Sequence, residues 1–563
     1  MAEWYSYTMG KFINEFKWIL SLGLLFVSFP HFVLAQSANL DSLIDKRIAE
    51  MSLEEKVGQL FIVGFPHKTV SKDLDRFISN YKPGSFLLFK RNIASLKQVR
   101  SLNEQLYRLS FKHTRLPPLI AIDQEGGAVS RLPISPAPPN ALAIGQTQSP
   151  LLAEEIAYQT GLFLREVGFN MNLAPVLDVA DPFQTNFIGV RSFGSEPNLV
   201  SQLGLAYSKG LLRASVIPTA KHFPGTGNLI ADPHHNLVVN PSKLADLTER
   251  DVPPFAAYSE LGTNTAIMMS HLSYPALDDS NEPASFSAKI SKTLLREQLK
   301  FKGLVLTDDL QMQGSRQLLR PEAGALKALK AGSDIVMLTW SFRDQGRAFD
   351  HVKNAVRKGL LSKEELDQKL RNILRAKAFA NLHRRDPEMP SLLVGESLTS
   401  RSYESLEKQV LDHNLKNNLQ KNPAFTVTLV RKVAQESQIC LISPSSEFTS
   451  SFLATTRIAT KNKVLKGNFE AAKVKRWLKS QSCTRIIAAV TGPKTARMLN
   501  SLPAKTKSET IVVNLAAPKY FNKENDYFRV IQLYFNHDSA GTKIAENLEQ
   551  ILADSNIESV TSK

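Results

Sequence analysis

Charged and imidazole side chains occur where several short apolar segments of this sequence end. The run 123–127 (DQEGG) follows one such segment, and His222, His271 and Asp308 lie at the ends of three others. A single aspartate at a strand end is often a loop cap, and a single histidine is more often structural. Several such ends together favour one functional cleft, formed by Asp123, Arg131, Arg191, Lys221, His222, His271, Asp308 and Asp309.

The loop 225–235 contains a second candidate pair, Asp232 and His234. Pro233 disfavours the helical region for Asp232, and residues two apart in an extended segment point the same way. A carboxylate beside an imidazole fixes the tautomer of the ring and raises its pKa, which suits a general acid/base. The alternative is that Asp232 caps a turn and His234 is solvated.

Asp308 follows the apolar residues 304–306, so packing can hold its carboxylate rigidly, as a nucleophile requires. Asp309 beside it would point elsewhere and serve as a structural partner. The spacing alone does not choose between the two aspartates.

Eight short apolar segments alternate with helical stretches and would position these residues. Continuously apolar strands separated by helices predict a parallel sheet covered on both sides, and eight such units fit a (β/α)8 barrel better than an open sheet. In a barrel all carboxyl ends of the strands lie on one face. Helices are expected over 40–60, 151–167, 198–212, 323–331 and within 345–385. The expected strands are 60–65, 85–89, 119–122, 171–176, 218–222, 266–271, 304–307 and 335–338.

The rest of the chain is divided into further units by composition. Residues 1–35 resemble a signal peptide, with two lysines, an apolar stretch and the end Val33-Leu34-Ala35, so we expect an exported protein, periplasmic or secreted; an uncleaved signal anchor is the alternative. Residues 36–385 would form the TIM-type barrel and 386–405 a linker. A helix over 403–419 and five apolar segments predict a smaller α/β sandwich over 406–563: 426–430, 439–442, 485–490, 510–515 and 530–534.

The composition excludes several classes of protein. The 563 residues are 43% hydrophobic and 22% charged, which is ordinary for a packed protein and excludes a disordered or fibrous chain. Two cysteines, Cys440 and Cys483, are too few for a disulfide scaffold or a Cys-rich zinc module. The net charge of +16 is concentrated at the C-terminal end, where residues 401–563 hold 24 basic and 14 acidic residues.

Five motifs of the sequence resemble glycoside hydrolase family three, and within it the β-N-acetylhexosaminidase branch of two-domain type. They are 119–132 (LIAIDQEGGAVSRL), 168–179 (GFNMNLAPVLDV), 221–227 (KHFPGTG), Asp232-Pro233-His234 and 303–312 (GLVLTDDLQM). The resemblance implies that Asp308 is the nucleophile of a retaining mechanism, with His234 as general acid/base and Asp232 as its partner. It further implies no cofactor and an exo-acting β-N-acetylglucosaminidase for peptidoglycan fragments or related amino-sugar glycosides. The implied binding residues for the terminal N-acetylglucosamine are Asp123, Arg131, Arg191, Lys221 and His222.

Three positions depart from the pattern of the branch: Thr226 replaces a common His, Pro233 a common Ser, and Ala128 a frequent Arg. Thr226 and Pro233 flank the acid/base, so the mobility of its loop is in question. A catalytically silent wall-binding protein is therefore an alternative, as is a β-glucosidase-type member, although that type takes its acid/base from the second domain.

A metal-dependent barrel hydrolase would use the histidines as ligands, but their spacing matches no helical metal motif, so we predict no metal site. The candidate ligands would be His222, Asp232, His234, His235 and His271.

The basic run 461–479 would suggest nucleic acid by itself. On an exported sugar hydrolase an anionic envelope polymer or a membrane surface is the better partner, and we expect no nucleic acid. A solvated helix face is the other interpretation of the run.

Overall fold

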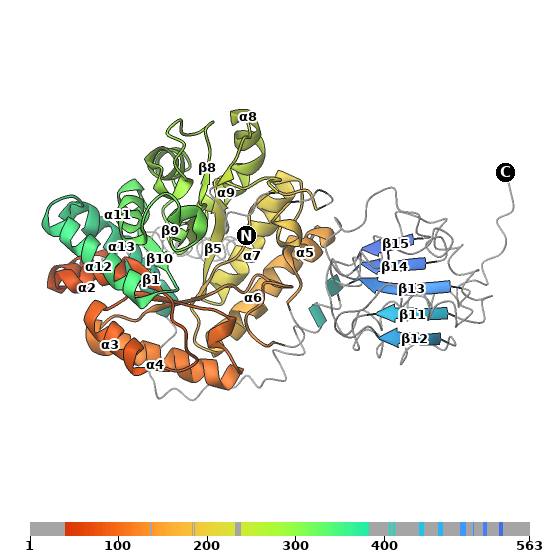
Figure 1. Ribbon diagram of the computed structural model, residues 1–563, viewed down its shortest axis with the longest axis horizontal. Helices are drawn as coiled ribbons and strands as arrows, with labels where there is room; N and C mark the ends of the chain where they lie inside the picture. Colours follow the sequence, from red (N-terminus) through yellow and green to blue (C-terminus); the bar gives the residue numbers. More distant parts are fainter. Residues whose placement is uncertain are drawn as a thin grey trace, which may run out of the picture.

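The computed structural model of the protein (Figure 1) contains a closed barrel and a separate parallel sheet. The residues that it describes are 40–134, 138–182, 184, 186–230 and 238–381, with short segments at 405–406, 409–410, 439–443, 460–464, 485–490, 499, 510–514 and 529–532. The predicted signal peptide and the linker 386–405, apart from residue 405, lie outside these residues. Within the described ranges, no helix combines the length and apolar character needed to cross a membrane.

Eight parallel strands close the barrel, in the order β1-β10-β9-β7-β5-β4-β3-β2. Each of the eight predicted segments overlaps one of these strands, so the (β/α)8 prediction is confirmed. Their side chains are almost all buried, because the barrel interior lies on one face and the helices on the other. The strands are β1 (Phe61–Val63), β2 (Ser85–Leu88), β3 (Leu119–Ile122), β4 (Met171–Asn172), β5 (Ile217–Phe223), β7 (Ala266–Met269), β9 (Leu304–Asp309) and β10 (Ile335–Leu338). A further short pair, β6 (Val238–Val239) and β8 (Leu272–Ser273), is also parallel.

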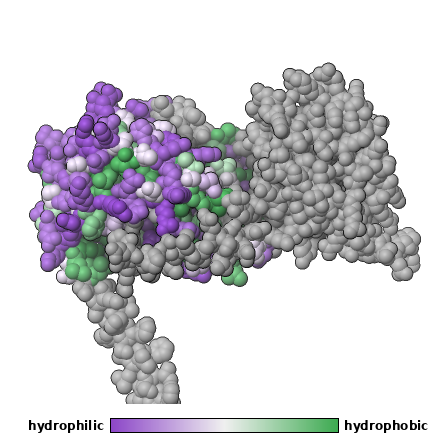
Figure 2. Space-filling view, turned by 90° about the horizontal axis from the view of Figure 1, so that it is seen from below, coloured by the Kyte–Doolittle hydropathy of each residue, from purple (hydrophilic) through white to green (hydrophobic). Residues whose placement is uncertain are grey.

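Helices surround the barrel (Figure 1), and their starts follow from the sequence. Four of them, α6, α7, α9 and α11, begin with proline in the first turn, where the missing N–H costs no hydrogen bond. The face shown in Figure 2 is mostly hydrophilic where it is described, with smaller hydrophobic areas. The helices are α2 (Leu53–Gln59), α3 (Lys72–Tyr81), α4 (Leu96–Thr114), α5 (Ala141–Thr147), α6 (Pro150–Glu166), α7 (Pro197–Arg213), α8 (Leu244–Asp246), α9 (Pro253–Ser259), α10 (Gln313–Arg316), α11 (Pro321–Ala331), α12 (Phe342–Arg357) and α13 (Lys363–Asn381). Short 3₁₀ or π segments are η1 (Lys90–Asn92), η2 (Gly189–Arg191), η3 (Leu247–Asp251), η4 (Ala284–Phe286) and η5 (Lys289–Gln298).

The single helix predicted over 40–60 is wrong, because the chain forms two helices, at residues 40–50 and α2. A capping box separates them: Glu55 N donates to Ser52 Oγ at 3.3 Å, and Ser52 N donates to Glu55 Oε2 at 2.9 Å. These bonds satisfy backbone donors that a continuous helix would have paired internally. The apolar spacing is the same in both helices, so periodicity alone did not reveal the break.

Two barrel strands contain an irregularity at the level of the predicted site. Between Lys221 and Phe223, β5 advances two residues while its neighbour β7 advances one. Between Leu306 and Asp309, β9 advances three residues while β10 advances two. Each extra residue marks a β-bulge, which redirects the side chains of a strand and is common beside active sites.

The C-terminal part contains a five-stranded parallel sheet in the order β12-β11-β13-β14-β15. Four of its strands match predicted segments, whereas 426–430 lies outside the described residues. The strand β12 was not predicted because its lysines interrupt any apolar run; it lies at an edge of the sheet, where lysine is commonly found. Lys461 and Lys463 therefore belong to a strand and not to a helix face. The strands are β11 (Ile439–Ser443), β12 (Thr460–Val464), β13 (Arg485–Val490), β14 (Thr510–Asn514) and β15 (Arg529–Gln532).

Replacing Ser52 by alanine tests the helix boundary. The Ser52→Ala variant loses the acceptor for the Glu55 N–H, so we expect the free energy of unfolding to fall by about 1 kcal/mol in denaturant titrations. The Ser52→Thr variant keeps the hydroxyl and should retain most of that stability. Equal stability of the alanine variant and the wild type would contradict the capping role.

Candidate active site

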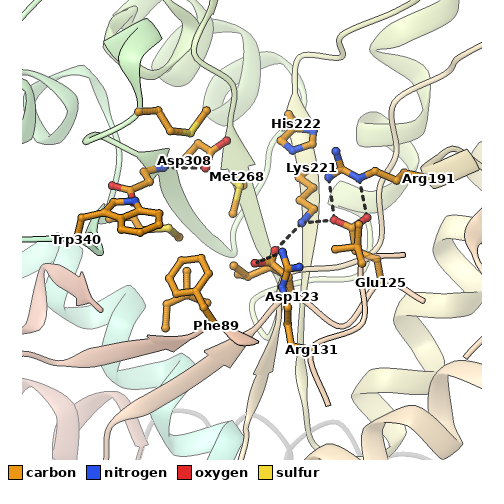
Figure 3. Close-up of a pocket in the computed structure, with 16 residues that line it drawn as sticks. Phe89, Asp123, Glu125, Arg131, Arg191, Lys221, His222, Met268, Asp308 and Trp340 are labelled. Atoms are coloured by element: carbon orange, nitrogen blue, oxygen red, sulfur yellow. Dashed lines mark hydrogen bonds and ion pairs between the residues drawn. The ribbon is translucent and has the colours of Figure 1, made fainter. Parts of the chain in front are cut away.

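A cavity of about 340 Å³ opens at the carboxyl ends of the barrel strands (Figure 3). Its lining comes from residues in or just after seven of the eight strands. Of the eight residues predicted to form the cleft, seven line this one cavity: Asp123, Arg131, Arg191, Lys221, His222, Asp308 and Asp309. The predicted pair Asp232 and His234 lies at 231–237, outside the described residues, between β5 and β6.

A buried network of four charged side chains forms one wall of the cavity. Lys221 Nζ lies 2.9 Å from Asp123 Oδ1 and 2.6 Å from Glu125 Oε1. Arg191 donates two hydrogen bonds to Glu125, from Nε and Nη2, each at 2.8 Å. The side chains of Lys221 and Glu125 are only 3% and 5% exposed, so these charges neutralise one another away from water. Arg131 extends the network, with Nη2 3.7 Å from Asp123 Oδ2.

The network keeps its charges in spite of burial. Burial opposes the ionisation of Glu125, but Arg191 and Lys221 outweigh it and hold the pKa of that carboxyl well below its usual range. Burial likewise opposes protonation of Lys221, yet Asp123 and Glu125 raise its pKa above the ordinary value for lysine. The wall therefore presents fixed charges and strong hydrogen-bonding groups near neutral pH, which suits recognition of a polar ligand.

His222 is held by a carboxylate that lies behind it. Its Nδ1 lies 2.7 Å from Oδ2 of Asp178, which is fully buried. Asp178 Oδ1 also accepts from the backbone N–H groups of Thr226, at 2.9 Å, and His222, at 3.3 Å. Burial opposes ionisation of Asp178, but His222 and these donors lower its pKa, so the carboxylate accepts and Nδ1 donates. In the neutral ring Nε2 is then left as a hydrogen-bond acceptor.

Asp308 and Asp309 both line the cavity but lie in different surroundings. Asp308 is half-buried, and its Oδ1 accepts from the backbone N–H of Asp309 at 2.8 Å. Asp309 is buried, and its carboxylate accepts from Thr339 Oγ1 and from Gln311 N. Burial, and to a smaller extent Asp308, raises the pKa of Asp309 to about 6.

Apolar and aromatic side chains form the opposite wall. In Figure 3 Phe89 and Trp340 lie across the cavity from the charged network, with Asp308 near them. Three methionines also line the cavity, so its lining is partly charged and partly apolar, which suits a ligand with both polar and apolar surface. The apolar lining residues are Leu87, Phe89, Val129, Leu173, Met268, Met312, Met337 and Trp340.

The structure adds two residues to the predicted set and removes one. Glu125 was visible within the run 123–127, but nothing in the spacing distinguished it from a loop residue. Asp178 lies in a loop after β4, within the motif 168–179, but nothing in the spacing assigned it to the site. His271 does not line the cavity: it is buried, with Nδ1 2.8 Å from Ser285 Oγ and Nε2 3.2 Å from the carbonyl oxygen of Asp309.

Two of the five candidate metal ligands, His222 and His271, lie among the described residues. His222 Nδ1 bonds to Asp178, and both ring nitrogens of His271 have protein partners. Among the residues that the structure describes, no three His, Cys, Asp or Glu side chains are grouped as metal ligands.

A parallel barrel with polar residues collected at the carboxyl ends of its strands is the arrangement of barrel enzymes. The sequence model of the family described as glycosyl hydrolase family 3 N-terminal domain matches residues 52–376, a range that includes all eight barrel strands. The chain belongs to glycosyl hydrolase family 3.

Relatives and solved structures agree with this assignment. The chain is 31% identical over 331 residues to β-hexosaminidase A of Pseudoalteromonas piscicida, covering 55% of this chain and 55% of that relative. It is 35% identical over 279 residues to a β-hexosaminidase of Nitrosomonas eutropha, covering 48% of this chain and 78% of that one. The structure of a family 3 β-N-acetylglucosaminidase from Paenibacillus sp. str. FPU-7 superposes with a TM-score of 0.78 at 26% identity, covering 89% of this chain and 97% of that chain.

Replacing Glu125 by glutamine tests the charge network. The Glu125→Gln variant keeps the shape of the side chain but leaves Lys221 and Arg191 with one counter-charge fewer in a buried site. We expect the free energy of unfolding to fall by about 3 kcal/mol in denaturant titrations. The matched control is Glu104→Gln, which breaks the exposed pair with Arg108 and should cost less than about 1 kcal/mol. Equal effects of the two substitutions would contradict the network.

The raised pKa of Asp309 predicts a pH dependence of stability. The folded protein binds a proton at Asp309 up to about pH 6, whereas the unfolded chain releases it near the ordinary value of 3.8. The contribution of Asp309 to the free energy of unfolding should therefore fall as pH rises from about 4 to about 6. The Asp309→Asn variant does not titrate there, so its free energy of unfolding should rise relative to the wild type by roughly 1.4 kcal/mol per pH unit in that window. Parallel pH profiles of the two proteins would contradict the assignment.

Proposed function

We propose that this protein is an exo-acting β-N-acetylglucosaminidase that removes one terminal β-linked N-acetylglucosamine at a time by a retaining mechanism. The observation that carries the proposal is the position of Asp308 in the same cavity as the charged network. The similarity to the β-hexosaminidase relatives and to the Paenibacillus β-N-acetylglucosaminidase supports the choice of sugar. A cavity of about 340 Å³ suits a single terminal sugar better than a chain of several.

The charged wall would hold the terminal sugar. Asp123 can accept hydrogen bonds from sugar hydroxyl groups, and Lys221 can donate to them. Arg191 and Arg131 can donate to hydroxyl or acetamido oxygens. His222 can accept a hydroxyl proton at Nε2, because Asp178 occupies its Nδ1. Since each of these groups is already oriented by a protein partner, little ordering remains to be done when the sugar binds.

Asp308 would then attack the anomeric carbon of the held sugar. One carboxylate oxygen forms the new bond to that carbon as the glycosidic C–O bond breaks, and His234 gives its proton to the departing oxygen. In the second step His234 removes a proton from water, the water oxygen bonds to the anomeric carbon, and the ester to Asp308 breaks. Asp232 would orient and polarise His234. Asp309 is less suited to attack, because Thr339 and Gln311 already bind its oxygens.

The natural setting is part of the same proposal. A signal-like segment at residues 1–35 favours export, and an exported enzyme of this specificity would act on peptidoglycan fragments (muropeptides) or related amino-sugar glycosides. The positive excess of residues 401–563 would attract an anionic envelope polymer or a membrane surface.

Trapping the covalent intermediate tests the nucleophile. Incubation with a 5-fluoro-N-acetylglucosaminyl fluoride should slow the second step and leave the sugar attached to the enzyme. We expect peptide sequencing by mass spectrometry to place the label on Asp308. A label on another residue would reject Asp308, and hydrolysis with inverted anomeric configuration, measured by NMR, would reject the retaining mechanism.

Replacing His234 by alanine tests the acid/base. The variant cannot protonate the departing oxygen, so it should lose more than about 100-fold in kcat/KM on a disaccharide but much less on aryl glycosides whose leaving groups need no proton. Added azide should restore the second step and yield the β-glycosyl azide. Equal losses on both kinds of substrate would contradict the role of His234.

A further inference from the structure

Trp340 has a large apolar side chain that is exposed to solvent. It follows β10 and lines the cavity, yet the residue is 62% exposed. Its backbone N–H donates to Gln311 Oε1 at 2.8 Å, so its main chain is fixed although its ring is exposed. An exposed indole at the edge of a binding cavity is a candidate contact surface for a ligand, because its burial on binding removes apolar area from water.

The indole is supported from one side by Arg91. The guanidinium carbon lies 4.3 Å from the centroid of the Trp340 ring and 4.2 Å from that of Phe89. Arg91 is itself held by hydrogen bonds to the carbonyl oxygens of Thr339, at 2.9 Å, and Phe65, at 3.3 Å. A cation over one face of the ring covers that face and restrains it. The exposed area of Trp340 therefore belongs mainly to the rest of the ring.

The position of Trp340 determines which part of a substrate reaches it. In Figure 3 the charged network lies on one side of the cavity, Trp340 and Phe89 lie on the other, and Asp308 lies close to Trp340. A terminal sugar bound to the charged network with its anomeric carbon at Asp308 places the scissile bond toward Trp340. The group beyond that bond then leaves the cavity along the exposed ring.

From this geometry we propose that Trp340, supported by Arg91, is the binding platform for the sugar on the leaving-group side of the scissile bond. This inference rests on the proposed function. The axial C–H groups of a β-linked pyranose give it an apolar face, which matches a flat indole in size and polarity. Trp340 is thus a residue that determines specificity for the leaving group, and it takes no part in the bond-breaking step.

The test compares two substrates that share the terminal sugar. N,N′-diacetylchitobiose carries a second sugar beyond the scissile bond, whereas N-acetylglucosaminyl azide carries a small leaving group that cannot cover an indole. For the Trp340→Ala variant we expect kcat/KM to fall by about tenfold or more on the disaccharide and by less than about twofold on the azide. The inhibition constant of free N-acetylglucosamine should also stay within about twofold. The Trp340→Phe variant, which keeps a ring, should recover part of the loss.

The control is Phe111→Ala, which removes another partly exposed aromatic ring, 41% exposed, from helix α4. This variant should leave kcat/KM unchanged on both substrates. Equal losses on the disaccharide and the azide, or a matching loss of N-acetylglucosamine affinity, would overturn the proposal and assign Trp340 to the terminal-sugar site. A wild type that turns over neither substrate would instead reject the proposed function, so the two failures are distinguishable.

Fluorescence gives a second readout that does not depend on turnover. The chain has four tryptophans, at positions 4, 18, 340 and 477, and Trp340 lines the cavity. A non-hydrolysable thio-linked disaccharide should shift the emission of the wild type, and the Trp340→Phe variant should lose the shift. The Arg91→Gln variant should raise KM for the disaccharide while kcat on the azide is kept. An unchanged shift in Trp340→Phe would contradict the platform.

Discussion

The site depends on one buried ammonium group, Nζ of Lys221, which two carboxylates share. Asp123 and Glu125 come from the loop after β3, Arg191 from the loop after β4, and Lys221 from β5 itself, so the network joins three neighbouring parts of the barrel. Buried charges are costly unless they are paired, and here each charge has an opposite partner within hydrogen-bond distance. The same pairing that makes burial tolerable also fixes the directions in which these groups face the cavity. The polar wall is therefore ordered before any ligand arrives.

Two β-bulges make this wall and the opposite one possible. In a regular strand successive side chains point to opposite faces, so Lys221 and His222 would not both line one cavity, nor would Asp308 and Asp309. The register shifts in β5 and β9 occur at these residues, and all four side chains line the cavity. One bulge brings Lys221 and His222 to the cavity, where Asp123 and Asp178 hold them in place. The other supplies the half-buried carboxylate of Asp308, which we propose as nucleophile, beside the buried Asp309, whose backbone N–H binds it.

The cavity is lined partly by charged and partly by apolar side chains, and this division would orient the proposed sugar. Hydroxyl and acetamido groups would find partners mainly on the side of the charged network, while the methionines, Phe89 and Trp340 offer apolar area. A pyranose ring has both characters, with polar substituents at its edge and C–H groups on its faces. The scissile bond would then lie where the two walls meet, at Asp308. The proposed platform at Trp340 continues the apolar wall toward solvent.

The sequence by itself determined the barrel and the identity of most site residues. Eight apolar segments separated by helical ones are a long-range pattern, and the carboxyl ends of parallel strands must share a face, so Asp123, Lys221, His222 and Asp308 could be placed together in advance. The sequence did not reveal the capping break at Ser52, because the apolar spacing is the same in the helices on either side. It did not reveal the edge strand β12 either, because lysines interrupt any apolar run there. Only the tertiary structure decided that Glu125 and Asp178 hold the site and that His271 is a buried structural residue. Those roles depend on which buried polar groups contact each other across the fold, and the spacing of residues in the sequence does not predict such long-range contacts.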